Sequence, residues 1–126
     1  MGFYMHQVDA RFFIPEKNVK KALRAVKNLK RSGGYSWVSE DFYLKNSLPT
    51  ILAEWRWAVE TDDDGNITHV AFEGEKLGDE VTLFNALAPF VKAGSYIEMH
   101  GDEETMWRWV FENGEMVEKN PTVSWD

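Results

Sequence analysis

The chain has 126 residues, no cysteine and a formal net charge of −7. This length fits one domain with a core of its own, the lack of cysteine excludes disulfides and thiolate metal sites, and the negative charge argues against a general nucleic-acid binder or a binder of anionic membranes. No apolar run approaches the roughly 20 residues of a membrane-spanning helix, and the first residues lack the pattern of a secretion signal, so we expect a cytoplasmic protein.

The first 34 residues predict a strand followed by a long helix. Residues 3–14 are rich in aromatic and β-branched side chains, and Pro15 ends this pattern. Apolar residues then recur at helical spacing until Gly33 and Gly34. The other faces of this helix carry Lys17, Lys20, Lys21, Arg24, Lys27, Lys30 and Arg31. These cations form either a solvated helix face or a basic contact surface.

The middle of the chain predicts shorter elements. Residues 35–38 (YSWV) fit a short strand, and residues 46–55 fit a short helix with Asn46 or Ser47 as its cap and Pro49 in its first turn. Residues 55–60 and 66–73 flank an Asp-rich turn that contains Gly65. This pattern is typical of a β-hairpin.

The second half predicts another long helix and a run of strands. Residues 78–95 have helical periodicity, although Pro89 within them predicts a kink or an early end. Residues 96–100, 105–111 and 115–118 then read as antiparallel strands, with turns at Gly101-Asp102 and Asn113-Gly114.

Trp-Arg-Trp occurs twice, at residues 55–57 and 107–109. An offset of 61 residues superposes the two long helices and matches Tyr35 to Tyr96. We therefore predict a single α+β domain over residues 1–126, in which residues 3–61 and 66–119 form a pseudo-repeat. The largely antiparallel sheet would come from two βαββ units, with two long helices packed on one of its faces.

In a strand, successive side chains point to opposite faces of the sheet, so the arginine of each Trp-Arg-Trp triplet would face away from its two tryptophans. Trp55 and Trp57 would share one face, and Arg56 would lie on the other among carboxylates; the second triplet would do the same. The tryptophans then either pack under the helices or line an exposed platform for stacking. Trp37 and Trp125 are less constrained and are candidates for surface anchors.

Charge is distributed unevenly along the chain. Residues 1–53 contain nine basic and four acidic residues, whereas residues 54–126 contain five and seventeen. A concentrated acidic surface with aromatic anchors suits binding to a basic protein, without direct contact to nucleic acid or membrane. The candidate partner-binding residues are Asp62, Asp63, Asp64, Asp102, Glu103, Glu104, Tyr96 and Trp125.

Metal binding is the alternative. Residues 62–73 match several positions of a calcium-binding loop, but Ile67 stands where that loop needs glycine, and a hairpin turn explains the stretch better. His6, Glu60, His69 and Glu112 are placed symmetrically in the two units. This arrangement resembles the metal site of the vicinal-oxygen-chelate family, which pairs βαβββ modules. The resemblance implies a small-molecule-binding protein or a metal-dependent enzyme, with these four residues as ligands.

The segment GSYIEMHGDEETMWRWVFENGEM is similar to short uncharacterised proteins of bacteria and their phages. This resemblance implies an accessory or inhibitory role. We therefore expect a non-catalytic inhibitor, immunity protein or anti-defence protein without a cofactor, acting on a basic, nucleic-acid-handling partner. The alternatives are the paired-module enzyme and a structural protein that self-associates, for instance as a homodimer.

Overall fold

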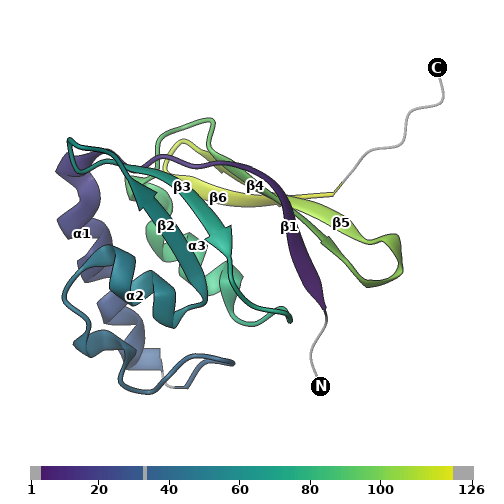
Figure 1. Ribbon diagram of the computed structural model, residues 1–126, viewed down its shortest axis with the longest axis horizontal. Helices are drawn as coiled ribbons and strands as arrows, with labels where there is room; N and C mark the ends of the chain where they lie inside the picture. Colours follow the sequence, from purple (N-terminus) through teal and green to yellow (C-terminus); the bar gives the residue numbers. More distant parts are fainter. Residues whose placement is uncertain (1–3, 33, 121–126) are drawn as a thin grey trace.

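The computed structural model describes residues 4–32 and 34–120, which form an α+β fold (Figure 1). The strands are β1 (Met5–Arg11), β2 (Trp57–Thr61), β3 (Ile67–Phe72), β4 (Tyr96–Gly101), β5 (Met106–Glu112) and β6 (Glu115–Lys119). The α-helices are α1 (Glu16–Lys27), α2 (Leu48–Glu54) and α3 (Glu80–Leu87). Short 3₁₀ helices are η1 (Asn28–Ser32), η2 (Phe42–Leu44), η3 (Ala88–Phe90) and η4 (Asp102–Glu104).

The strands form an antiparallel four-stranded sheet of order β1-β4-β5-β6 and a separate β2–β3 hairpin. One side chain joins the two sheets. The Gln7 amide on β1 donates to the Val70 carbonyl at 3.0 Å and accepts from the Phe72 N–H at 2.8 Å, both on β3. Reciprocal backbone bonds between Ile14 and Ile67 close one end of this junction. β1 and β3 therefore lie side by side and antiparallel, although they share no regular ladder.

Counting this junction, the strands follow the order β2-β3-β1-β4-β5-β6. The connections β1-α1-β2 and β3-α3-β4 each cross over one intervening strand. This is the β-α-β-β-α-β arrangement of split βαβ folds, extended by β5 and β6. In space, β4 is the counterpart of β2, and the second Trp-Arg-Trp strand belongs to the extension.

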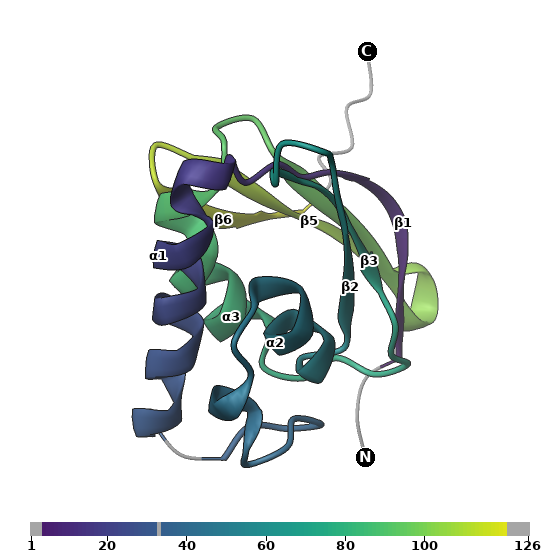
Figure 2. The same cartoon turned by 60° about the vertical axis from the view of Figure 1, so that its left-hand side comes forward.

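The helices lie together on the concave side of the strand layer, and the opposite face of β1, β4, β5 and β6 is open (Figure 2). The core between them is strongly aromatic. Phe84 on α3 lies at its centre, with ring centroids 5.0 Å from Trp57, 5.2 Å from Trp109 and 5.9 Å from Phe111. No helix in the described ranges is long and apolar enough to cross a membrane.

Several local predictions are confirmed. Ser47 caps α2 by accepting from the Thr50 N–H at 3.3 Å, with proline in the first turn. α3 ends at Leu87, and Pro89 lies in the following 3₁₀ turn. The Asn113-Gly114 turn joins β5 to β6, with positive φ at both residues. Local turn and cap chemistry determined these boundaries.

Two predictions about the first half are wrong. Residues 35–38 form a turn, not a strand, because Tyr35 packs on Trp55 at 4.9 Å and the Ser36 N–H bonds Asp79 at 2.7 Å. The first Trp-Arg-Trp triplet is not a strand segment either. Trp55 caps the C-terminal end of α2, Arg56 has φ +70°, and only Trp57 belongs to β2.

All four tryptophans of the two triplets are nevertheless buried, so the core interpretation is correct and the platform interpretation is not. The arginines differ. Arg108 lies on the open sheet face, 2.6 Å from Glu98, as strand alternation predicts. Arg56 lies beside the buried Glu80, because its triplet does not alternate as a strand would. The described residues contain three α-helices: α1 and α3 at the two positions predicted for long helices, although α3 ends early, and the short α2.

Candidate interaction surface

The clearest candidate surface surrounds the turn between β4 and β5. Asp102, Glu103 and Glu104 are all exposed there, and the Asp102 carboxylate accepts from the Tyr4 N–H at 3.2 Å. The turn closes through backbone bonds from the Gly101 N–H to the Thr105 carbonyl and from the Thr105 N–H to the Asp102 carbonyl. The acidic side chains are thus carried on a hydrogen-bonded hairpin end and are exposed to solvent.

The backbone of this turn is strained. Glu103 has φ 56° and Glu104 has φ 62°, which is the pattern of a type I′ turn. Such turns strongly favour Asn-Gly, because a side chain makes the left-handed region costly. Strain of this kind in non-glycine residues is found preferentially at functional sites.

A hollow of about 630 Å³ lies beside the turn, between the start of β1 and residues 74–75. Glu75 and Asp102 give it a negative lining, and Tyr4 and His6 form its other side. Two exposed apolar side chains flank the acids: Tyr4 is 51% exposed and Met106 is 37% exposed. We call this surface the acidic edge and define it as Tyr4, Glu75, Asp102, Glu103, Glu104 and Met106.

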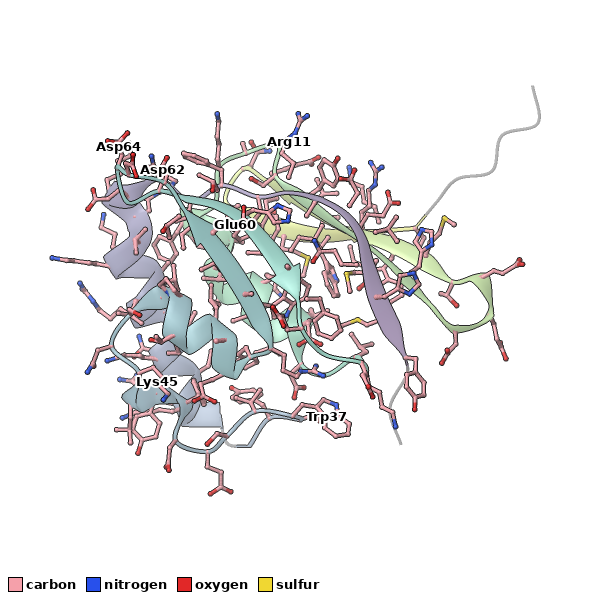
Figure 3. The ribbon with its side chains drawn as sticks, viewed as in Figure 1. Arg11, Trp37, Lys45, Glu60, Asp62 and Asp64 are labelled. Carbon is pink, nitrogen blue, oxygen red and sulfur yellow. The ribbon has the colours of Figure 1, made fainter. Side chains whose placement is uncertain are left out.

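The other predicted acidic cluster lies elsewhere. Asp62, Asp63 and Asp64 form the β2–β3 turn, at the end of the molecule opposite the β4–β5 turn (Figures 1 and 3). Asp62 has a structural role, because its carboxylate accepts bonds from Asp64 and Asn66, and these bonds hold its pKa below the ordinary value. Asn66 in turn accepts from the Glu16 N–H at 2.8 Å at the start of α1.

Tyr96 lies on the open sheet face. Its hydroxyl donates to Asp9 at 2.7 Å and the Arg108 guanidinium lies 4.8 Å from its ring centroid. The bond from Tyr96 lowers the pKa of Asp9 and raises that of Tyr96. Tyr96 is therefore part of a polar row across the sheet, at the opposite end of β4 from the β4–β5 turn. Trp125 lies outside the described residues.

The four candidate metal ligands are not assembled into one site. Glu60 and His69 are cross-strand neighbours in the β2–β3 hairpin. His6 faces His100 on β4, with ring centroids 5.8 Å apart, and Glu112 lies at the end of β5, 3.3 Å from Lys119. Residues 4–32 and 34–120 contain no group of three or more potential ligand side chains that is placed to hold a metal ion.

The ion pair between Arg56 and Glu80 was not predicted from the sequence. Glu80 is 1% exposed and accepts from Arg56 at 3.1 Å and from the Gly78 N–H at 2.7 Å. Burial raises the pKa of Glu80, and the bonds from Gly78 and Arg56 offset part of this effect. The Trp57 indole N–H interacts with the same carboxylate outside normal hydrogen-bond geometry.

Packing around this pair is tight. A Cβ atom on Gly74 would come within 2.8 Å of Arg56, and one on Gly78 within 2.9 Å. The exposed Trp37 covers the guanidinium from outside at 5.9 Å (labelled in Figure 3). An acidic residue at a helix start is so common that the sequence carries no signal for this pair. It links α2, the 72–80 segment and the 35–38 turn, and we assign it a structural role.

Comparison with protein-family models, with curated proteins and with solved structures finds no match to this chain.

Proposed function

We propose that this protein is a non-catalytic binding protein that uses its acidic edge to engage a basic, nucleic-acid-handling protein in the cytoplasm. Inhibition of a toxic nuclease by an immunity protein, or of a defence nuclease by an anti-defence protein, is the kind of activity that fits. It requires no cofactor and no contact between this surface and nucleic acid.

The observation that carries the proposal is the conformation of Glu103 and Glu104. Each left-handed non-glycine residue costs about 1–2 kcal/mol relative to a relaxed conformation. Asn-Gly would remove most of that cost at no loss to the hairpin. The presence of two glutamates at these strained positions is explained if their carboxylates contact a binding partner.

The surroundings of the turn support the same conclusion. Clustered exposed carboxylates create a negative potential that attracts a cationic partner and speeds its association. Affinity comes mainly from a few apolar or aromatic anchors. Tyr4 and Met106 supply such anchors beside the acids, and the hollow between Glu75 and Asp102 offers room for a cationic side chain.

Paired charge reversals test this proposal. Glu103→Lys with Glu104→Lys alters the acidic edge, and Asp63→Lys with Asp64→Lys makes the same change in net charge at the opposite turn. The probes are a short Lys/Arg-rich peptide and a panel of purified basic nucleases. We expect the first variant to weaken binding by about tenfold or more, equivalent to about 1.4 kcal/mol, and the second to weaken it much less.

Salt titration supplies a second criterion. Association with the wild-type protein should slow as ionic strength rises, because the Debye length is about 10 Å at 0.1 M. Equal losses in the two variants would show that net charge alone acts, and unchanged binding in both would refute the proposal.

A further inference from the structure

A stripe of unpaired cations runs along α1 and η1, opposite to the buried side of the helix. Its members are Lys17, Lys20, Lys21, Arg24, Lys27, Lys30 and Arg31. Lys17, Lys20, Arg24 and Lys27 recur at intervals of three and four residues, which places them on one line of the helix. Ala22 and Val26, on the other side, are fully buried. We call this set the basic stripe.

The fold does not neutralise the basic stripe. None of its seven members makes an ion pair within residues 4–32 and 34–120. Lys27 donates a hydrogen bond to the neutral Asn46 side chain at 3.2 Å. Like charges at such intervals destabilise a helix by about 0.2–0.5 kcal/mol per pair. The helix dipole favours Arg24 and Lys27 in the last turn, but within the described residues no carboxylate pairs with the stripe to offset the repulsion among its members.

A groove of about 550 Å³ opens at the C-terminal end of the stripe. Lys30 and Arg31 line one side of it, and Tyr35 and Tyr43 contribute aromatic rings, with the Lys30 ammonium 4.5 Å from the Tyr43 centroid. One carboxylate, that of Glu40, also lines the groove. A groove of this size holds a small organic group such as a nucleobase.

We propose that the basic stripe and this groove bind single-stranded nucleic acid. Cations along a line match a phosphate backbone, and aromatic rings between cations match unpaired bases, which is the usual composition of single-strand binding surfaces. A base-paired duplex or an anionic membrane would use the stripe but would leave the aromatic groove without a ligand. This inference is independent of the proposed function of the acidic edge.

The net charge of −7 does not oppose this binding, because the charges are segregated. Side chains with nitrogen tips project from α1 on the left of Figure 3, whereas the β4–β5 turn lies at the far right of the molecule. At physiological salt the Debye length is about 8 Å, so a ligand on α1 is screened from that distant turn. Asp62 and Asp64, in the turn whose Asn66 bonds the Glu16 N–H, are close to the start of α1, so the C-terminal part of the stripe should contribute most.

Fluorescence anisotropy with a labelled oligothymidylate tests the proposal. Wild-type protein should bind, and the logarithm of affinity should fall linearly with the logarithm of salt concentration. Lys20→Glu with Arg24→Glu should abolish binding or reduce the salt slope by about 1.4, since each lost phosphate contact removes about 0.7. Lys92→Glu with Lys119→Glu changes net charge equally, away from the stripe, and should bind like the wild type.

Tyr43→Ala separates stacking from charge. It should weaken oligothymidylate binding several-fold and leave the salt slope unchanged. Circular dichroism melting of each variant verifies that the fold is retained. The proposal is overturned if the wild type does not bind the oligonucleotide, if the two charge-reversed variants bind equally, or if the protein binds anionic vesicles or a poly-glutamate peptide but not the oligonucleotide.

Discussion

At the scale of single residues, the β4–β5 turn gives a direct test of strain. Replacing Glu103 by Asn and Glu104 by Gly puts the preferred type I′ residues where positive φ is required. We expect the free energy of unfolding to rise by about 1–3 kcal/mol. Asn and Gly adopt the left-handed conformation at little cost, and the extra chain entropy that glycine loses on folding, about 0.5–1 kcal/mol, offsets part of this gain. Urea denaturation measures this gain, and the same variant should bind the basic probes more weakly. A variant that is less stable than the wild type would show that the turn is not strained.

The buried Glu80 predicts a pH dependence. Its raised pKa means that the folded state keeps a proton at pH values where the unfolded chain, with a glutamate pKa near 4.5, has lost it. The folded state then binds more protons, so the free energy of unfolding falls as pH rises through the window that begins near 4.5. In the Glu80→Gln variant this contribution to the pH dependence should disappear.

Arg56→Met probes the same pair from the other side. It leaves Glu80 buried without its cation, which should cost about 3–5 kcal/mol at pH 7. The loss should shrink as the pH is lowered toward 4.5, because a protonated Glu80 needs no cation. Arg108→Met is the matched control: its partner Glu98 is on the open face, so a small and nearly pH-independent effect is expected. Equal losses for both variants at both pH values would contradict this account.

At the scale of elements, Gln7 determines how the two sheets meet. Hydrogen bonds from its side-chain amide replace the regular backbone ladder that is absent between β1 and β3. At the same point, the pairing of β1 with β4 has a register shift between Gln7 and Asp9. Gln7→Met keeps the volume but leaves the Val70 carbonyl and Phe72 N–H without partners. Each orphaned group costs about 1–3 kcal/mol, so a total of about 2–6 kcal/mol is expected from denaturant unfolding.

Amide hydrogen exchange gives this prediction its control. The Phe72 N–H should exchange faster in Gln7→Met, while N–H groups in the β4–β5 ladder, such as that of Trp109, should change only as much as global stability does. Uniform acceleration across both sheets would mean that Gln7 contributes to stability without specifically joining β1 to β3.

The second Trp-Arg-Trp strand predicts a contrast between two tryptophans. Trp109 is fully buried against Phe84 and donates to Glu118 at 3.0 Å, whereas Trp37 is 53% exposed. Trp109→Ala should therefore cost about 3–5 kcal/mol. The same truncation at Trp37 removes one cation–π contact and should cost about 1 kcal/mol or less. Thermal melting of both variants compares them, and similar shifts would contradict the assignment of Trp109 to the core.

The elements that the sequence predicted well depend on local chemistry. The cap at Ser47, the early end of α3 before Pro89 and the Asn113-Gly114 turn follow from residues within a few positions of each boundary. Residues 35–38 contain strand-forming side chains, but Tyr35 and Ser36 are held by partners far along the chain. Tertiary contacts of this kind override local propensity and have no signature in a single sequence.

The candidate site divides in the same way. Asp102, Glu103 and Glu104 were predicted because consecutive acids in a turn are visible in the sequence. Tyr4 and Glu75 join them through long-range contacts, including the bond from the Tyr4 N–H to Asp102, and could not be predicted. The separation of this turn from residues 62–64 also depends on the strand order, which the 61-residue repeat did not reveal.

At the scale of the whole molecule, charge segregation has a consequence that net charge hides. The sequence isoelectric point is about 5.0, so a protein with evenly distributed charge would pass through a cation exchanger at pH 7. The basic stripe concentrates seven cations on one side of the fold, and an exchanger bead senses charge only within about a Debye length of the contacting face, about 10 Å at 0.1 M salt. We therefore expect retention near this ionic strength on both an anion exchanger and a phosphocellulose column. Lys20→Glu with Arg24→Glu should abolish retention on phosphocellulose and strengthen it on the anion exchanger. Lys92→Glu with Lys119→Glu, which changes net charge by the same amount, should still be retained on phosphocellulose. If the wild-type protein passes through phosphocellulose, or if both variants lose retention to the same degree, retention depends on net charge alone. The basic stripe then does not act as a distinct charged surface.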